Sequence, residues 1–281
     1  MRTFTAAVPG GSLFVYEWGE QGDPAVLYWD GLGGTGLHAN EIAPALAEYG
    51  LRVVAPDPPG HGRSPALPPD SYRPSRLASL AADLLSALGI ERAAFLGFSW
   101  GGRVGCSFAA LFSKRTTSLT LVEGGIFLSS AAGDLAACIV EARREREKES
   151  FPSWDAFFEY ERNSLGRWTP AVADAHRAVM REEDGRVVPI LEAETLGAIT
   201  HGGGREPVTE TYPLIAAAEV PVLLVTAQRP GLDVTSTPIT RFRAALPKAR
   251  VESIAGGIHD LVSYAPGRVA ELVGELVTAN A

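Results

Sequence analysis

Short, unbroken runs of apolar residues recur along this chain, and each run is followed by a loop and then by a helical pattern. Residues 25–29 are the clearest example, residues 93–96 and 220–225 are similar, and residues 118–122 are apolar apart from Ser118 and Thr120. An apolar run without polar alternation is typical of a strand that is covered on both faces, as in a parallel sheet between two layers of helices. This feature predicts an α/β fold.

The order of the patterns predicts a sheet that is interrupted once. Two alternating segments at the start predict a hairpin, because they flank Pro9-Gly10-Gly11. The expected strands are residues 3–8, 12–18, 25–29, 52–56, 93–96, 118–122, 220–226 and 250–254. The expected helices among them are residues 36–49, 74–88, 100–112, 239–246 and 266–279. A core domain of residues 1–123 and 207–281 is therefore predicted.

Residues 124–206 break this rhythm and predict a helical cap inserted into the core. Four helical patterns occupy this segment, at residues 135–149, 154–163, 170–181 and 188–199. The second of them carries Trp154 and Phe158, which are candidate substrate-binding residues because aromatic side chains often line apolar pockets. Aromatic residues at helical spacing also pack the interior of a small cap, and this alternative stays open.

The composition excludes several classes of partner. The net charge is −8 and no basic tract is present, whereas binding to nucleic acid requires clustered Lys and Arg. No run approaches the ~18 apolar residues of a membrane span, and no signal peptide is apparent. Two cysteines, Cys106 and Cys138, fit a reducing compartment, and Cys106 is expected to be a packed side chain. We expect a soluble, cytoplasmic protein without nucleic-acid or membrane partners.

The segment Gly97-x-Ser99-x-Gly101 lies between an expected strand and an expected helix. A nucleophile elbow requires this context, because the sharp turn needs small neighbours and raises the serine above the edge of the sheet. Ser99 is therefore the candidate nucleophile.

A serine hydroxyl becomes a good nucleophile only when a base takes its proton. His259 follows the last expected strand, in Gly256-Gly257-Ile258-His259, and so lies at the same sheet edge as Ser99. We expect His259 to be the base and the neighbouring Asp260 to point elsewhere. The other histidines are expected in structural or surface positions: His38, His61, His176 and His201.

The base needs a carboxylate that orients it. Two candidates follow expected strands: Glu123, which lies 24 residues after Ser99, and Asp233, which lies beyond the usual position for such an acid. Glu123 is favoured, because Asp233 would require its loop to bend back. Asp233 remains the alternative.

The loop that begins at Asp30 is expected to complete the site. An oxyanion hole combines the N–H of the residue after the nucleophile, here Trp100, with an N–H from this loop, for which Leu32 is the candidate. Asp30 and Gly31 are expected to contact the substrate, because Gly31 lets the backbone approach closely.

The same loop matches the dinucleotide fingerprint Gly31-x-Gly33-x-x-Gly36, and Asp57 follows 21 residues after Gly36. Two strands precede this loop, however, and Asp57 runs directly into a tight Pro-Gly turn. We expect no nucleotide cofactor and no metal.

Together these residues resemble the α/β-hydrolase superfamily. The likeness is carried by residues 30–36, residues 57–64, the elbow at residues 97–102, and the loop at residues 256–259. It implies an eight-stranded, mostly parallel sheet with helices on both faces and a helical cap above Ser99. Many members have His-Gly where this chain has Asp30-Gly31. Asp-Gly-Leu-Gly with the order Ser, Glu, His is similar to the zearalenone-type lactonases.

The resemblance and the residues predict a serine hydrolase that cleaves a small carboxylic ester or lactone through an acyl-enzyme on Ser99. Three alternatives stay open. The same residues serve a carbon–carbon bond hydrolase or a perhydrolase, and the fold also serves non-catalytic ligand receptors. The sequence does not specify the substrate or the oligomeric state.

Overall fold

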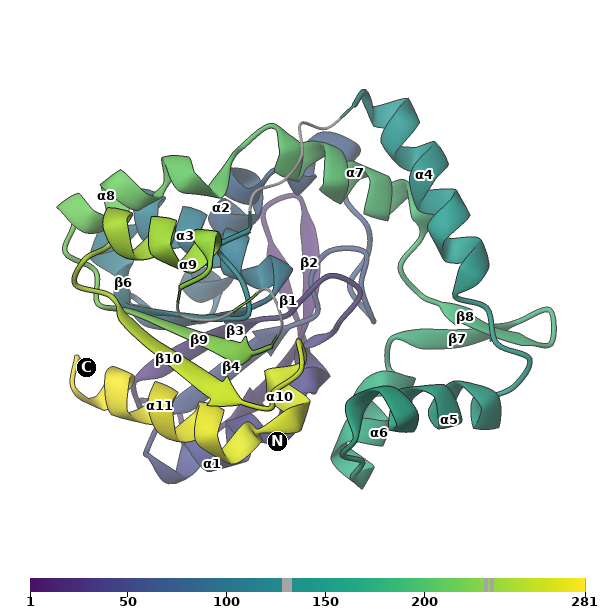
Figure 1. Cartoon of the computed structure of the whole chain (residues 1–281), viewed down its shortest axis with the longest axis horizontal. Helices are drawn as coiled ribbons and strands as arrows, with labels where there is room; N and C mark the ends of the chain where they lie inside the picture. Colours follow the sequence, from purple (N-terminus) through teal and green to yellow (C-terminus); the bar gives the residue numbers. More distant parts are fainter. Residues whose placement is uncertain (128–132, 230–231, 233–234, 281) are drawn as a thin grey trace.

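An eight-stranded sheet forms the centre of the computed structural model, which describes residues 1–127, 133–229, 232 and 235–280 (Figure 1). The order across the sheet is β1-β2-β4-β3-β5-β6-β9-β10. The first two strands are antiparallel to their neighbours, and the remaining pairs are parallel. The strands are β1 (Arg2–Val8), β2 (Gly11–Trp18), β3 (Ala25–Trp29), β4 (Arg52–Pro56), β5 (Ala93–Phe98), β6 (Thr116–Val122), β9 (Val222–Gln228) and β10 (Arg250–Ala255). This topology confirms the predicted fold class.

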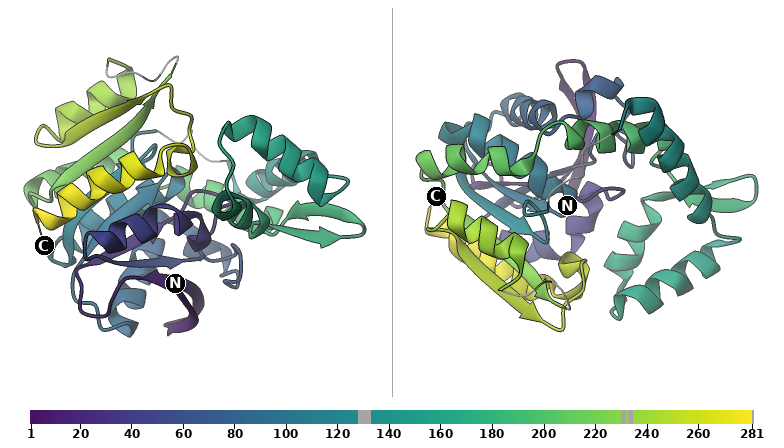
Figure 2. Two further views of the ribbon diagram at one scale, coloured as in Figure 1. Left: turned by 90° about the horizontal axis from the view of Figure 1, so that it is seen from below. Right: turned by 45° about the horizontal axis from the view of Figure 1, so that its top comes forward.

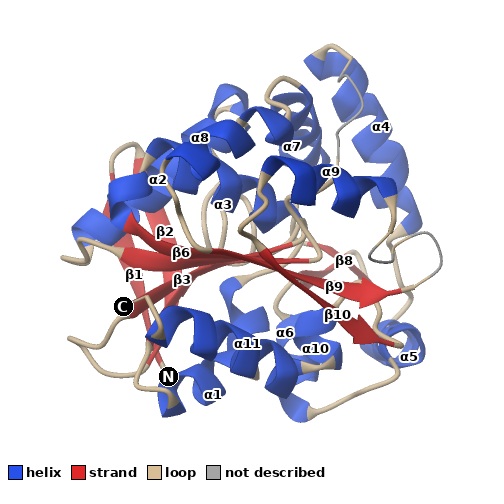
Figure 3. Cartoon of the chain, turned by 60° about the vertical axis from the view of Figure 1, so that its left-hand side comes forward, coloured by secondary structure: helices blue, strands red, loops and turns tan. Residues whose placement is uncertain are grey.

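Helices cover both faces of the sheet (Figure 3). One face is covered by α1 (Ile42–Glu48), α10 (Leu261–Tyr264) and α11 (Pro266–Thr278), and the other by α2 (Pro74–Ala87), α3 (Trp100–Leu111), α8 (Tyr212–Ala217) and α9 (Thr237–Ala245). Successive residues of β3 pack into opposite layers: Val26 and Tyr28 on the α11 side, and Leu27 and Trp29 on the α3 side. Both faces of a central strand are buried, which explains its unbroken apolar sequence.

A separate group of elements is inserted between β6 and α8 and projects from the sheet (Figure 2). It contains α4 (Leu135–Lys148), α5 (Trp154–Leu165), α6 (Pro170–Arg177), β7 (Met180–Glu183), β8 (Arg186–Pro189) and α7 (Ala193–Gly204). The ends of α5 follow ordinary capping: Ser153 accepts the Ala156 N–H at 3.2 Å, and Gly166 ends the helix with φ +67°. We call this group the cap and keep its predicted limits, residues 124–206, as a proposal.

The prediction that the cap is wholly helical was wrong. The helix expected over residues 170–181 ends at Arg177, the helix expected over residues 188–199 begins only at Ala193, and an antiparallel hairpin lies between them. Asp184 and Gly185 form its turn, with φ +49° and φ +71°. Positive φ at both central residues suits the twist of a two-residue hairpin, and Asp-Gly favours that conformation.

Two further findings concern membranes and metals. Within the described residues, no helix is long and apolar enough to cross a membrane. The same part of the chain holds no group of three or more His, Cys, Asp or Glu side chains arranged for a metal ion.

Candidate active site

Ser99 lies on a strained turn between β5 and α3. Its φ is +51°, a value that a residue with a side chain rarely adopts. The glycines around it leave no room for a Cβ atom: one at Gly97 would meet the Gly101 carbonyl, and one at Gly124 would meet the carbonyl of Ser99 itself. Small residues are therefore required around the serine, as the sequence pattern predicts.

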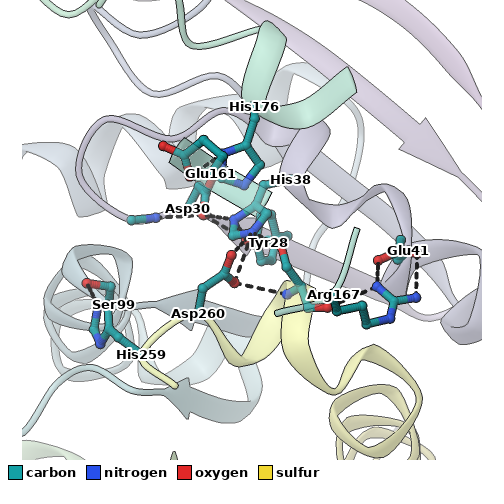
Figure 4. Close-up of polar contacts among 12 residues, drawn as sticks. Tyr28, Asp30, His38, Glu41, Ser99, Glu161, Arg167, His176, His259 and Asp260 are labelled. Atoms are coloured by element: carbon teal, nitrogen blue, oxygen red, sulfur yellow. Dashed lines mark hydrogen bonds and ion pairs between the residues drawn. The ribbon is translucent and has the colours of Figure 1, made fainter. Parts of the chain in front are cut away.

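His259 lies in the loop between β10 and α10 and reaches Ser99 across the end of the sheet (Figure 4). Its Nε2 atom is 2.9 Å from the Ser99 Oγ. The imidazole ring also packs against Phe98, with the ring centroids 5.4 Å apart. About half of the His259 side chain is exposed, so the base faces the open side of the site.

Glu123 completes a line of contacts behind His259. It follows β6 with φ +50°, and its side chain is fully buried. The Oε2 atom is 3.2 Å from the His259 Nδ1, and the Oε1 atom accepts the Ala227 N–H at 2.6 Å. Arg229 forms an ion pair with the same carboxylate, a contact that the sequence did not indicate. The alternative acid Asp233 lies outside the described residues.

The expected oxyanion donors belong to two segments that meet at Ser99. Trp100 is the first residue of α3, and the first N–H groups of a helix have no acceptor within that helix. Gly31 packs so close that a Cβ atom there would lie 3.2 Å from the Ser99 Cβ. Leu32 follows Gly31 and is partly exposed in the cavity wall. The assignment of Trp100 and Leu32 as donors stays a prediction.

Asp30 is fully buried at the base of this loop. Its Oδ1 atom accepts the Gly31 N–H and the Tyr28 hydroxyl, both at 2.8 Å, and lies 2.9 Å from the His38 Nδ1. Asp30 therefore braces the loop from within. Asp30 and Gly31 are among the residues that line the cavity, and their contact with substrate stays a prediction.

His38 contradicts the expectation of a surface position. Only 13% of its side chain is exposed, because the ring lies between Asp30 and Asp260. Burial alone lowers the pKa of His38, but these two carboxylates hold it well above the ordinary value for histidine. Asp260 points toward His38 and away from Ser99, as expected (Figure 4).

His61 packs beneath the elbow, as expected of a structural histidine. Its ring stacks on that of Trp100 at 5.7 Å, and its Nδ1 lies 3.0 Å from the Pro59 carbonyl oxygen. Burial lowers the pKa of His61 to about 4. The nearby Asp57 accepts the N–H groups of Gly36 and Arg63, yet its burial raises its pKa to about 6.

A cavity of about 500 Å³ lies between the core and the cap, and His259, which contacts Ser99, lines it. Its core side is formed by residues 30–35, His38, Phe98, His259 and Asp260. The cap side is largely apolar but includes two ion pairs, Arg146–Glu149 at 2.8 Å and His176–Glu161 at 3.1 Å. The apolar residues on the cap side of the cavity are Phe151, Phe157, Tyr160, Ala175, Val179, Met180 and Pro189.

Trp154 and Phe158 pack within the cap instead of facing this cavity. Their rings lie 5.8 Å apart, Phe158 contacts Trp168 at 5.9 Å, and the Arg177 guanidinium lies over Trp154. This contradicts their prediction as substrate-binding residues and bears out the alternative that they form the cap interior. The helix face that points toward the cavity is the one carrying Phe157 and Tyr160.

The fold and the elbow together define a class of protein. Residues 24–175 match the model of the family described as alpha/beta hydrolase fold. The chain belongs to this family, which confirms the resemblance found in the sequence.

Relatives with curated names match a shorter segment. An uncharacterized protein of Mycobacterium tuberculosis is 38% identical over 102 residues, which are 36% of this chain and 29% of that protein. A 2-hydroxy-6-oxononadienedioate/2-hydroxy-6-oxononatrienedioate hydrolase of Burkholderia vietnamiensis is 36% identical over 103 residues, covering 36% of this chain and 35% of its own length. Epoxide hydrolase A of Mycobacterium tuberculosis is 34% identical over 41% of this chain and 36% of its own. The chain thus matches about a third of the length of these relatives.

Solved structures match over nearly the whole chain. The thioesterase domain from the curacin biosynthetic pathway has a TM-score of 0.79 at 22% identity, covering 97% of this chain and 99% of that one. The enol-lactonase from Burkholderia xenovorans LB400 has a TM-score of 0.75 at 22% identity, covering 98% and 100%. At this level of identity the likeness shows the fold alone.

Proposed function

We propose that this protein is a serine hydrolase that cleaves a small carboxylic ester or lactone, with Ser99 as nucleophile, His259 as base and Glu123 as the orienting acid. The observation that carries the proposal is the 2.9 Å contact between the Ser99 Oγ and the His259 Nε2. This distance lies within the reach that a general base needs. Glu123 lies on the opposite side of the imidazole and fixes which ring nitrogen faces the serine.

The reaction follows from these contacts. The Ser99 Oγ attacks the carbonyl carbon of the ester, and the hydroxyl proton passes to the His259 Nε2. The carbon–oxygen bond to the alcohol then breaks, and the alcohol leaves with that proton, so an acyl group remains on Ser99. A water molecule, deprotonated by His259, attacks the acyl group and releases the carboxylic acid. In a lactone, the alcohol and the acid stay within one product molecule.

Negative charge develops on the carbonyl oxygen of the substrate when Ser99 attacks, and hydrogen-bond donors are needed to stabilise it. We assign the backbone N–H groups of Trp100 and Leu32 to this role, because both flank Ser99 and their segments are held by close glycine packing. A single such donor is commonly worth about 10²- to 10³-fold in kcat. The cavity between the core and the cap is the proposed site for the small-molecule substrate.

One relative supports a second candidate. The hydrolase of Burkholderia vietnamiensis, which is 36% identical over 103 residues, is named for a hydroxy-keto dicarboxylate. Such a compound has no ester linkage, so its hydrolysis would have to break a carbon–carbon bond. The same serine and histidine serve that chemistry. Parallel assays with aryl esters, lactones and a vinylogous 1,5-diketone therefore decide between the two: ester or lactone turnover with an inert diketone supports the first proposal.

Labelling with a fluorophosphonate probe tests the assignment of the nucleophile. The wild type should be labelled, and tryptic mass mapping should place the adduct on Ser99. Ser99→Ala should abolish both labelling and ester turnover while keeping the melting temperature. The matched control is Ser79→Ala, since the Ser79 hydroxyl donates to the Ser75 carbonyl within α2, on the side of the sheet covered by that helix. A wild type that is neither labelled nor active would indicate a non-catalytic ligand receptor.

A further inference from the structure

A chain of largely buried polar contacts joins two loops near Ser99, residues 30–36 and residues 256–260 (Figure 4). At its centre the His38 ring lies 2.9 Å from the Asp30 Oδ1 through Nδ1, and 3.1 Å from the Asp260 Oδ1 through Nε2. The same Nε2 is 3.0 Å from the Ser263 Oγ. Asp30 and Asp260 are far apart in sequence, and His38 connects them directly.

Each carboxylate shapes one of the two loops. Asp30 accepts the Gly31 N–H and thereby sets the backbone that leads into Leu32. Asp260 directly follows His259, and its Oδ1 accepts the Ser263 N–H at 2.9 Å, which begins α10. His38 therefore contacts both the side chain that shapes the proposed oxyanion loop and the residue next to the proposed base.

A positive charge on the His38 ring would compensate the negative charge of Asp30. Asp30 is fully buried directly behind the loop that would stabilise an oxyanion, and an uncompensated carboxylate there opposes negative charge on the substrate. An imidazolium donates from both ring nitrogens, so it can hydrogen-bond both carboxylates at once, whereas neutral histidine has only one N–H. The two carboxylates also hold the pKa of His38 well above its usual value, despite the opposing effect of burial.

We propose that His38 is a positioning residue. As an imidazolium it fixes the oxyanion loop (residues 30–36) relative to the base loop (residues 256–260), and it offsets the negative charge of Asp30. This inference rests on the proposed function and deepens it. His38 does not touch the reacting atoms: the Phe98 ring lies between it and His259, 5.3 Å and 5.4 Å from the two rings.

The surroundings of His38 leave few other charges to consider. Tyr28 on β3 contributes a hydroxyl 3.3 Å from Nδ1, and burial together with Asp30 raises its pKa well above the usual value, so it acts as a neutral donor. Helix α6 of the cap packs on the short helix η1 (Gly36–Asn40) that carries His38, and it brings the His176–Glu161 pair to this side. The Arg167 guanidinium donates to the Ser263 carbonyl at 2.9 Å.

Substitutions at His38 separate positioning from a general structural role. His38→Gln and His38→Phe should lower kcat for an aryl ester by about 100-fold, because small misplacements of catalytic groups cost this much. KM should change less than kcat, since His38 and Asp260 line the cavity with only a small exposed fraction of their side chains, whereas both loops beside Ser99 depend on them. Affinity for a boronic acid that mimics the tetrahedral intermediate should fall in parallel with kcat/KM. His201→Gln, at the cap surface, is the matched control and should retain wild-type kinetics.

A second variant covers the case in which His38 variants do not fold. Asp260→Asn keeps an N-cap for α10 but removes one of the two carboxylates, so it should lower kcat in the same way. In the wild type itself, ¹⁵N-histidine NMR should show His38 protonated on both nitrogens at pH 8. A neutral His38 at pH 8, or folded His38 and Asp260 variants with wild-type kcat and boronate affinity, would overturn the proposal. A wild type that fails to react at Ser99 would instead overturn the proposed function, so the two failures are distinct.

Discussion

The position of Glu123 is fixed from several sides. It is fully buried, has a positive φ, and contacts His259, Ala227 and Arg229. If it orients His259, Glu123→Gln should lower kcat by about 10³- to 10⁴-fold, because an amide at this position favours the wrong imidazole tautomer. The measurement is steady-state kinetics with an aryl ester, alongside thermal unfolding to show that the variant folds.

Asp233→Asn is the matched comparison for this experiment. The prediction requires that it retain activity within about threefold of the wild type, since only one carboxylate can hold the imidazole. Loss of activity in Asp233→Asn together with retention in Glu123→Gln would reverse the assignment and make Asp233 the acid.

Gly31 yields a second prediction at the scale of single residues. A Cβ atom here would lie 3.2 Å from the Ser99 Cβ and equally close to the Phe98 ring, which is tighter than ordinary packing. Gly31→Ala should therefore displace the oxyanion loop and lower kcat about tenfold or more, with a smaller effect on the free energy of unfolding. Gly267→Ala, which has open space around it in α11, is the control. Equal kinetics for the two variants would contradict the close approach of the loop to Ser99.

Ser99, His259 and Glu123 could be predicted from the sequence because Ser99 and Glu123 directly follow strands and His259 lies in the short loop after β10. The carboxyl ends of parallel strands meet at one edge, so the position in sequence gives the place in space. His38 could not be placed in this way, since its partner Asp260 is 222 residues away. One signal was present: Asp30 directly follows a strand that is apolar at every position, and a carboxylate buried there needs hydrogen-bonded or cationic partners.

At the scale of elements, the hairpin of β7 and β8 shows why the cap was harder to predict than the sheet. Its strands have only four residues each, so they carry too little alternation to outweigh the neighbouring helical patterns. The Asp184-Gly185 turn was the available signal. Trp154 and Phe158 were misplaced for a related reason, because helical spacing alone does not tell which apolar face points to a cavity and which to the cap interior.

The linker between α5 and α6 attaches the cap to the core. Arg167 forms a bidentate ion pair with Glu41, which precedes α1, and the Thr169 hydroxyl donates to the same carboxylate at 3.0 Å. About a third of the Arg167 side chain is exposed, so solvent screens part of this interaction. Arg167→Met and Glu41→Gln should show a coupling of about 1 kcal/mol in a double-mutant cycle of chemical unfolding.

The same two variants should also raise KM more than they lower kcat. The cap forms one wall of the cavity, whereas the contacts of Ser99 with His259 lie within the core. Arg144→Met provides the control, because Arg144 pairs only with Glu141 along the exposed face of α4 in the described residues. Additive effects of Arg167→Met and Glu41→Gln on unfolding would show that the ion pair does not hold the cap.

The fold of the whole molecule followed more directly from the sequence than its details did. Strand β3 is buried on both faces, so its sequence is apolar at every position and is easily recognised. The loops after the parallel strands then lie at one edge, which fixes the location of the site. The polar contacts between loops depend on tertiary packing, and no periodic pattern encodes them.

Two buried groups beneath the elbow give the molecule opposing responses to pH. Asp57 has a folded-state pKa of about 6, above its usual value, so its ionised form destabilises the fold and this cost is relieved as pH falls through 6. His61 has a folded-state pKa of about 4, below its usual value, so the unfolded chain takes up a proton first and stability is lost as pH falls from about 6.5 toward 4. The two contributions therefore largely cancel between pH 4 and 6.

Removing one of the two groups should make the pH dependence of the other measurable. In His61→Phe only the response of Asp57 remains, so the free energy of unfolding relative to the wild type should rise by about 2 kcal/mol between pH 7 and pH 5. Phe cannot replace the contact with the Pro59 carbonyl, so the variant should be less stable at both values of pH, but this constant loss does not affect the change with pH. Chemical unfolding at several values of pH gives the measurement, with His201→Phe as control. A difference between wild type and His61→Phe that stays constant with pH would mean that the buried imidazole does not resist protonation, and the cancellation with Asp57 would then be absent.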